Sequence, residues 1–236
     1  MILSKSSKVT SSIHTIRSIN SNPIERVSSY KYLGIWLDDC LSFKTHVLEL
    51  AKKVKVKLGA LYRIRPCLTL ENRKLIVQST ILSVLDYGDV LFMHAAPSVL
   101  KPLDTVYHSA IRFITGDPFK THHCTLYKNV GWSSLSVRRE KHCLLFIYKA
   151  LQSKLPTYLT SLLNFKSSCY NTRSRSLISL DVPFTRTEVG KLAFSFFAPF
   201  KWSIAQEALQ MKEFVSIDNF RHKLDALLVD QCLCFK

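Results

Sequence analysis

The strongest constraint on the fold is a stretch beginning at Ser42, in which apolar residues recur at steps of three and four. Such spacing places them along one side of an α-helix, where they can be buried, while the other sides of this stretch are basic. The stripe consists of Val47, Leu50, Ala51, Val54, Leu58, Leu61 and Tyr62. Proline lacks the amide hydrogen that a helix interior needs, so the sequence predicts one long amphipathic helix that ends before Pro66.

Two more helices are expected next, because helix start and stop signals alternate along the chain. Thr69 is a suitable N-cap for the first, and Gly88 can adopt the left-handed conformation that ends a helix. Ser98 is the expected N-cap of the second, with Pro102 in the first turn, where no amide donor is needed. Gly116 then ends it. Three helices with short links favour a compact bundle.

The segments on either side of this bundle have different patterns. Residues 30–38 alternate aromatic and aliphatic side chains around one glycine, as a short half-buried strand does. Residues 135–151 are strongly helical in pattern, and the run 143–148 is apolar almost all round, which is typical of a buried helix. We therefore predict a mainly α-helical chain with a small N-terminal β element (1–40), a three-helix bundle (41–116) and a second helical sub-domain (117–236).

Inside the second sub-domain the pattern is less regular. Residues 117–133 are loop-like, and the polar, basic residues 166–176 are typical of a linker or surface loop. Residues 189–209 are helical in pattern except that Pro199 must kink or split the helix. Ser216 is the expected N-cap of a last amphipathic helix.

The chain is strongly basic, with 33 lysines and arginines against 17 aspartates and glutamates, a net charge of +16. A field of this sign attracts polyanions, because binding releases their condensed counterions. RNA or DNA is therefore the first partner to expect. An ordinary solvated basic surface is the alternative, since net charge does not identify a ligand.

Two basic groups are candidates for this contact. In residues 41–75, nine basic residues stand against two acidic ones, and the candidates there are Lys52, Lys53, Lys55, Lys57, Arg63, Arg65 and Arg73. The alternative for this group is a solvated helix face whose lysine stems cover the edge of the core. In the second group, Arg173 and Arg175 lie beside Tyr170 on an expected loop, as single-strand binders require. Burial of the neighbouring aromatic residues in the core is the alternative for this group.

The sequence does not predict a membrane span. Residues 76–96 are apolar, but Asp86, Asp89 and His94 interrupt them, and burying those side chains in lipid is costly. Seven irregularly spaced cysteines, with no secretory leader, indicate a reduced, intracellular protein of the nucleus or cytoplasm.

A structural zinc site is not expected either. The candidate ligands are His-His-Cys at 122–124, His-Cys at 142–143 and Cys-x-Cys at 232–234. None of these has the paired ligand spacing of a structural zinc site, so no metal or other cofactor is predicted.

Several strings in the chain resemble one protein family, and they occur in the family's order over nearly the whole chain. They are Tyr-Lys-Tyr-Leu-Gly-Ile-Trp-Leu-Asp at 30–38, Leu-Ser-Phe at 41–43 with His46, Leu-Asp-Tyr-Gly at 85–88, Leu-Asp-Thr-Val-Tyr-His-Ser-Ala-Ile-Arg-Phe at 103–113, Trp-Ser-Ser-Leu at 132–135 with Arg138 and Arg139, Thr-Arg-Ser at 172–174, Arg-Thr-Glu-Val-Gly-Lys at 186–191, and Ala198, Pro199 and Trp202. This pattern resembles the end of the palm, the thumb and the following region of non-LTR (LINE-type) retrotransposon reverse transcriptases, the jockey-like and chicken-repeat-like group.

The resemblance implies roles for particular residues. Tyr32, Leu33 and Gly34 match the turn that grips the primer end, and the basic bundle becomes a thumb-like unit that holds the template–primer backbone. Polymerisation needs carboxylates that hold two Mg²⁺ ions, and by the resemblance these lie in palm and fingers regions upstream, which become expected partners in a longer polyprotein. Asp38 and Asp39 follow the turn, so we expect one of them to cap the next helix instead.

The expected function is therefore that of a catalytically incomplete fragment of an RNA-directed DNA polymerase that retains nucleic-acid binding, with Mg²⁺ needed only by a full-length polymerase. One alternative is a host-retained, non-enzymatic nucleic-acid-binding or scaffold protein. Another is a piece of an intact polymerase gene. The genomic sequence 5′ of Met1 would discriminate among the three.

Overall fold

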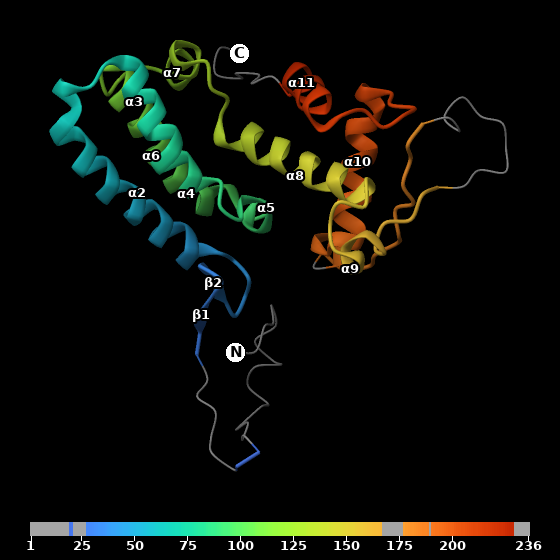
Figure 1. Cartoon of the computed structure of the whole chain (residues 1–236). Helices are drawn as coiled ribbons and strands as arrows, with labels where there is room; N and C mark the ends of the chain where they lie inside the picture. The colour runs from blue at the N-terminus through green and yellow to red at the C-terminus, as the bar shows by residue number, and fades with distance from the viewer. Residues whose placement is uncertain (1–18, 21–26, 167–176, 189, 229–236) are drawn as a thin grey trace. The chain divides into compact units, whose positions relative to one another are not determined.

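The computed structural model describes residues 19–20, 27–166, 177–188 and 190–228 (Figure 1). The chain divides into two compact units, Met1–Leu135 and Ser136–Lys236. Its described residues are mainly α-helical, with one two-stranded sheet near the N-terminus, which confirms the predicted fold class. The first unit extends past Gly116 because the segment that follows contributes side chains to its core.

The first unit contains a β-hairpin, in which β1 (Ser29–Tyr32) pairs with β2 (Ile35–Asp38). The last residue of β1 pairs with the first of β2, so the loop is Leu33 and Gly34, with φ of 46° and 88°. Positive φ at both positions is typical of the type I′ turn, whose twist matches that of paired strands. Glycine adopts this conformation freely, but leucine there costs about 1 kcal/mol or more, so other contacts must hold the turn.

The long amphipathic helix is confirmed as α2 (Lys44–Ile64), which ends before Pro66. It buries Val47, Leu50, Ala51, Val54 and Leu58 of the predicted stripe, whereas Leu61 is half-buried and Tyr62 is exposed. A short 3₁₀ turn, η1 (Arg65–Cys67), leads to α3 (Leu70–Val77). Thr69 caps α3 as predicted, because its hydroxyl oxygen accepts a hydrogen bond from the amide of Asn72 at 3.3 Å.

The helix predicted to start after Thr69 continues beyond α3 through a π-helical turn, η2 (Gln78–Leu82), into α4 (Ser83–Leu85). Each π turn shifts the backbone pairing by one residue, so side chains must help to satisfy the carbonyls. The hydroxyl of Thr80 donates to the carbonyl of Ile76 at 2.6 Å, and the hydroxyl of Ser83 donates to the carbonyl of Ser79 at 2.5 Å. The sequence pattern does not predict this wide turn.

Gly88 has the predicted left-handed conformation, with φ of 67°, and α5 (Asp89–Phe92) follows it. The next helix, α6, comprises Pro97–Thr115 and ends at Gly116, which has φ of 85°, as predicted. The predicted cap at Ser98 is wrong.

Helix α6 begins before that residue because Pro97 occupies its first position, where no amide donor is required. Pro102 therefore lies inside the helix and not in the first turn. The segment 117–133, expected to be a loop, contains α7 (His123–Val130), which the sequence pattern did not predict. Leu126 and Val130, four residues apart, are its buried residues.

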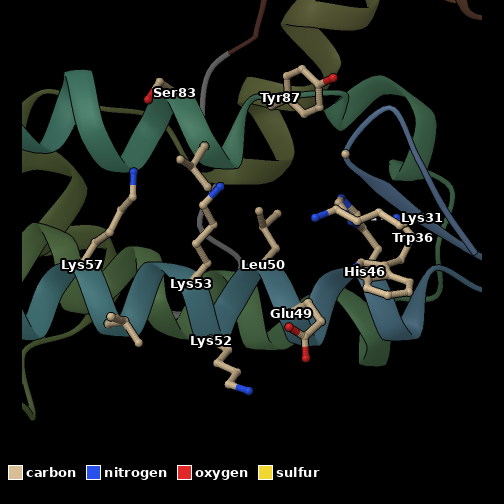
Figure 2. A pocket seen from close by; sticks show the side chains of 13 residues that line it. Lys31, Trp36, His46, Glu49, Leu50, Lys52, Lys53, Lys57, Ser83 and Tyr87 are labelled. Carbon is tan, nitrogen blue, oxygen red and sulfur yellow. Dashed lines mark hydrogen bonds between the residues drawn. The ribbon is translucent and has the colours of Figure 1, made fainter.

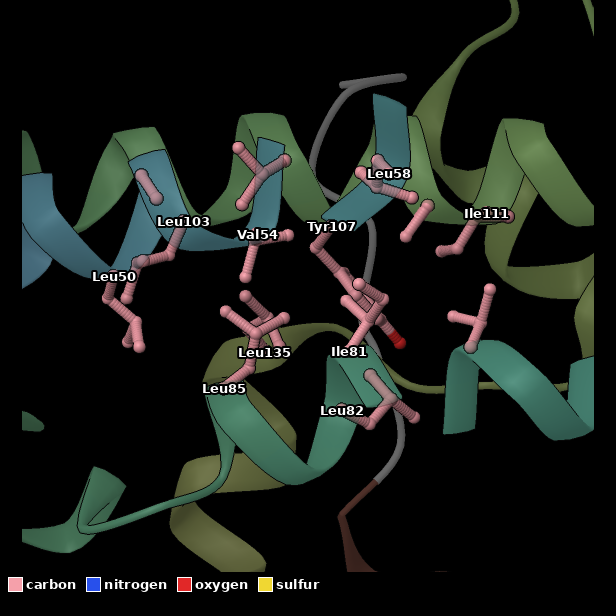
Figure 3. Close-up of a cluster of buried hydrophobic side chains, with 14 of the residues drawn as sticks. Leu50, Val54, Leu58, Ile81, Leu82, Leu85, Leu103, Tyr107, Ile111 and Leu135 are labelled. Carbon is pink, nitrogen blue, oxygen red and sulfur yellow. The ribbon is translucent and has the colours of Figure 1, made fainter. Parts of the chain in front are cut away.

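The core of the first unit forms between α2, α6 and the η2–α4 segment (Figure 3). Figure 3 shows Val54 and Leu58 of α2 facing Ile81 and Leu82, with Tyr107 of α6 between them. Within the apolar stretch 76–96, Val77, Ile81, Leu82, Leu85 and Phe92 are thus buried in a protein core, as expected. In the described part of the chain, no helix is both long and apolar enough to cross a membrane.

The second unit contains α8 (Leu135–Leu151, whose first residue belongs to the first unit), α9 (Thr157–Thr160), η4 (Gly190–Leu192), α10 (Phe194–Leu209) and α11 (Ile217–Leu227). Its core stacks the ring of Tyr148 on that of Phe220, with centroids 3.9 Å apart, beside the fully buried Trp202. Ser216 caps α11 as predicted. Helix α10 is a single element that contains Pro199, so of the two expected effects of this proline, a kink or a split, the split does not occur.

Two glycine variants test the docking of the hairpin on the rest of the first unit. A Cβ at Gly88 would lie 2.6 Å from Cδ1 of Ile35, in a left-handed backbone, so we expect Gly88→Ala to lower the unfolding free energy by about 2 kcal/mol or more. Gly59 lies inside α2, and a Cβ added there would meet no neighbouring side chain within 4 Å, so Gly59→Ala should raise the unfolding free energy by about 1 kcal/mol. Urea denaturation followed by circular dichroism measures both, and equal effects would contradict the docking.

Candidate nucleic-acid interface

An open groove of about 840 Å³ lies where the β-hairpin meets α2 and the segment that follows η2 (Figure 2). The groove has three walls: the hairpin, α2, and the segment after η2 that contributes Ser83, Val84 and Tyr87. The lining side chains that carry charge or aromatic surface include Lys31, Trp36, Lys53, Lys57 and Tyr87. The groove therefore combines cationic groups with flat rings, the two kinds of surface that hold a nucleic-acid strand.

The hairpin wall of the groove is fixed by the Leu-Asp-Tyr-Gly segment at 85–88. The hydroxyl of Tyr87 donates a hydrogen bond to the carbonyl of Leu33 at 2.7 Å. A Cβ on Gly34 would lie 3.3 Å from Cε1 of the same tyrosine, so the turn rests against the ring. The structure thus brings the predicted primer-grip-like turn, Tyr32, Leu33 and Gly34, onto another of the family-like strings, with Tyr32 and Leu33 exposed.

Helix α2 also contributes His46 and Leu50 to the lining of the groove. The His46 side chain is 3% exposed, its ring lies 5.1 Å from that of Phe92, and its Nδ1 accepts a long hydrogen bond of 3.4 Å from the amide of Trp36. Its Nε2 has no hydrogen-bond partner among the described residues. Burial lowers the pKa of His46 from its ordinary 6.5, so this ring joins hairpin to helix in its neutral form.

The lysines that line the groove are oriented differently. Figure 2 shows Lys53 pointing into the space between α2 and the opposite wall, whereas Lys52 and Glu49 point away from it. The Nζ of Lys57 donates to the carbonyl of Thr80 in the π-helical turn at 3.1 Å. Lys31 lies over the ring of Trp36, with Nζ 6.0 Å from the centroid.

Of the other predicted contact residues, those that the structure describes do not line the groove. Lys55 and Arg63 are exposed on α2, and Arg173 and Arg175 lie outside the described residues. The Nε of Arg65 donates to the carbonyl of Phe113 at 2.9 Å, and Nη1 of Arg73 donates to that of Ile114 at 3.4 Å. Both guanidinium groups thus bind the C-terminal carbonyls of α6, where positive charge is favoured. Their contact with nucleic acid, like that of the other predicted residues, stays a prediction.

The expected helix cap at Asp38 or Asp39 is wrong. Helix α2 starts with Phe43 as its N-cap, in the left-handed conformation with φ of 58° and no side-chain cap. The carboxylate of Asp38 instead accepts hydrogen bonds from the amide and hydroxyl of Ser42, at 2.6 and 2.9 Å, and so closes the turn before the helix. In the hairpin, Asp38 pairs with Ser29, which brings no second carboxylate to it.

Lys31, Trp36, His46 and Tyr87 were not predicted as site residues, although all four belong to the family-like strings. For Lys31 and Trp36 the sequence does contain a signal, namely the short turn between the two strands. A two-residue loop at Leu33 and Gly34 fixes the hairpin register and places Lys31 opposite Trp36. The position of Tyr87 depends on packing between distant segments, which no local pattern reveals.

Comparison with known proteins gives two curated relatives, both from mobile elements of flies. The chain is 25% identical over 127 residues to the probable RNA-directed DNA polymerase from transposon X-element of Drosophila melanogaster, a match covering 52% of this chain and 14% of that protein. It is 28% identical over 105 residues to the RNA-directed DNA polymerase from mobile element jockey of Drosophila funebris, covering 43% and 12%.

No family model and no solved structure matches the chain. The two relatives confirm the similarity to retrotransposon reverse transcriptases, over about half of this chain and a small part of each relative. Placement at the end of the palm and in the thumb stays a prediction.

The buried His46 predicts how stability depends on pH. Because its folded-state pKa lies below 6.5, acidification below that value protonates the unfolded chain first, and the free energy of unfolding falls. We expect His46→Phe to reduce this loss between about pH 7.5 and about pH 5.5, as measured by urea denaturation. His222→Phe, at an exposed position of α11, is the matched control and should leave the loss unchanged. An equal loss in His46→Phe and the unaltered chain would contradict the neutral, buried ring.

Proposed function

We propose that this chain holds the nucleic-acid substrate of a non-LTR retrotransposon RNA-directed DNA polymerase, with the groove beside the β-hairpin as the principal contact. The observation that carries the proposal is the position of Lys53, which points from α2 into a groove that Lys31 and Gly34 of the hairpin also line. The similarity to two retrotransposon polymerases supports the identity of the ligand.

The charge of the groove suits a phosphate backbone. Lys31, Lys52, Lys53 and Lys57 line it against one acidic residue, Glu49. Of these five side chains, Lys52 and Glu49 point away from the opposite wall. Contacts between lysines and phosphates do not depend on base sequence, and they weaken as salt rises because released counterions return. The groove therefore binds template–primer duplexes of different sequence alike.

The rings in the groove add a second kind of contact. Trp36 and Tyr87 stand on different walls, and the face of either ring can stack on a base or sugar where the strand leaves the duplex. The exposed Tyr32 and Leu33 at the hairpin tip place apolar surface beside the same strand. Lys55 and Arg63 lie on α2 outside the groove and add only to the long-range positive field, while Lys57, Arg65 and Arg73 also hold the bundle together through backbone carbonyls.

Polymerisation itself falls to other residues under this proposal. A two-metal site needs several carboxylates around a pair of Mg²⁺ ions. The carboxylate oxygens of Asp38 are engaged with Ser42, and the strand opposite brings Ser29 to that position. The described hairpin thus serves to grip, and the proposed grip requires no metal ion.

A pair of double variants tests the groove. We expect Lys31→Gln with Lys53→Gln to weaken binding to DNA and RNA–DNA duplexes equally, and to lower the slope of log affinity against log salt by about 0.9 for each phosphate that is no longer neutralised. Fluorescence anisotropy with labelled duplexes, over a series of salt concentrations, measures both quantities.

The control is Lys44→Gln with Lys55→Gln, which removes the same charge from the same region of the chain. Lys55 lies two residues after Lys53, about 160° around the helix, and neither Lys44 nor Lys55 lines the groove. This control should keep most of the affinity and slope. If both double variants lose affinity to the same extent, the general positive charge of the surface attracts nucleic acid, and the groove is not the principal contact.

A further inference from the structure

Three potential metal ligands meet at the start of α7. His122 is the N-cap of this helix, and His123 and Cys124 are its first two residues. One ligand atom from each side chain lies within 4.8 Å of the other two. All three side chains are half-buried, so an ion between them would have protein on one side and solvent on the other.

Neighbouring rings fix this cluster in place. The rings of His122 and His123 lie 4.1 Å apart, and His123 stacks on His108 of α6 with centroids 5.9 Å apart and planes 18° from parallel. The Nε2 of His108 is 2.6 Å from the hydroxyl of Tyr127, one turn further along α7. The cluster therefore stands on a packed contact between two helices, which lowers the entropy cost of arranging ligands.

We propose that His122, His123 and Cys124 bind one transition-metal ion, with Zn²⁺ as the first candidate. Two imidazole nitrogens and one thiolate form a donor set that suits Zn²⁺ and other ions that accept both nitrogen and sulfur. The fourth coordination position is open to water or to an external ligand. Paired ligand spacing is absent from the sequence because all three ligands are consecutive.

The distances are close to those that coordination requires. Zinc lies about 2.0–2.1 Å from a histidine nitrogen and about 2.3 Å from a cysteine sulfur, so tetrahedral ligand atoms stand on the order of 3.5 Å apart. From separations within 4.8 Å, small side-chain rotations close the site. Binding replaces the thiol proton of Cys124 by the metal and releases that proton to solvent.

Metal binding would change a hydrogen bond within the cluster. The Nδ1 of His122 accepts from the amide of Cys124 at 3.4 Å. Coordination through Nε2 requires a proton on Nδ1, so this long hydrogen bond breaks and a metal bond replaces it. The negative charge of the thiolate offsets the unfavourable placement of a cation at the N-terminal end of a helix.

The proposed site is independent of the nucleic-acid groove, because none of its ligands lines that groove. An ion here would hold the first turn of α7 in place. Since α7 supplies Leu126 and Val130 to the core of the first unit, metal binding is expected to raise the thermal stability of that unit.

Cobalt spectroscopy on the whole reduced chain tests the proposal. We expect Co²⁺ to give a thiolate-to-metal charge-transfer band that one equivalent of Zn²⁺ removes. The band should be absent in Cys124→Ser and retained in Cys67→Ser, a control that removes an exposed thiol elsewhere in the same unit. His123→Gln should weaken Co²⁺ binding by at least about tenfold, which provides a second variant if the serine variant does not fold.

Circular dichroism of each metal-free variant establishes that it is folded before titration. Absence of the charge-transfer band in the unaltered chain would overturn the proposal. Persistence of the band in a folded Cys124→Ser variant would do the same, because the ion would then bind another cysteine. Full retention of Co²⁺ affinity in His123→Gln would also contradict the assigned ligands.

Discussion

The hydrogen bond from the Tyr87 hydroxyl to the Leu33 carbonyl joins two segments that are far apart in the chain, and the groove depends on it. A hairpin of two four-residue strands is marginal by itself, and its turn holds a leucine in a strained conformation. Contact of Ile35 with Gly88 and of Trp36 with His46 completes the attachment. Without these interactions the hairpin would not form a wall of the groove, and Lys31 would have no defined position relative to α2.

The positive charge of the first unit serves two purposes that the sequence does not separate. Some cations satisfy backbone carbonyls: Lys57 binds the π-helical turn, and Arg65 and Arg73 bind the end of α6. Others, such as Lys53, extend into open space. A buried or partly buried carbonyl needs a donor in every state of the protein, so the first class maintains the shape of the surface from which the second class extends.

Local signals explain what could be predicted. Helix α2, the Thr69 cap and the Gly88 and Gly116 conformations follow from period and backbone preference within a few residues. The wrong predictions depend on choices among local alternatives or on distant packing. Pro97 displaced the expected cap, α7 is short and buries only two residues, and Asp38 binds Ser42 in the turn before α2 begins. Likewise, the groove arises from interactions between residues that lie tens of positions apart, such as Leu33 with Tyr87.

The most direct measurement of the central claim is a lysine footprint, in which the chain is acetylated with and without a template–primer duplex and each lysine is quantified by mass spectrometry. Binding in the groove predicts that the duplex protects Lys31 and Lys53 while Lys44 and Lys55 stay reactive. Protection of Lys44 and Lys55 with undiminished reactivity at Lys31 and Lys53 would contradict the account.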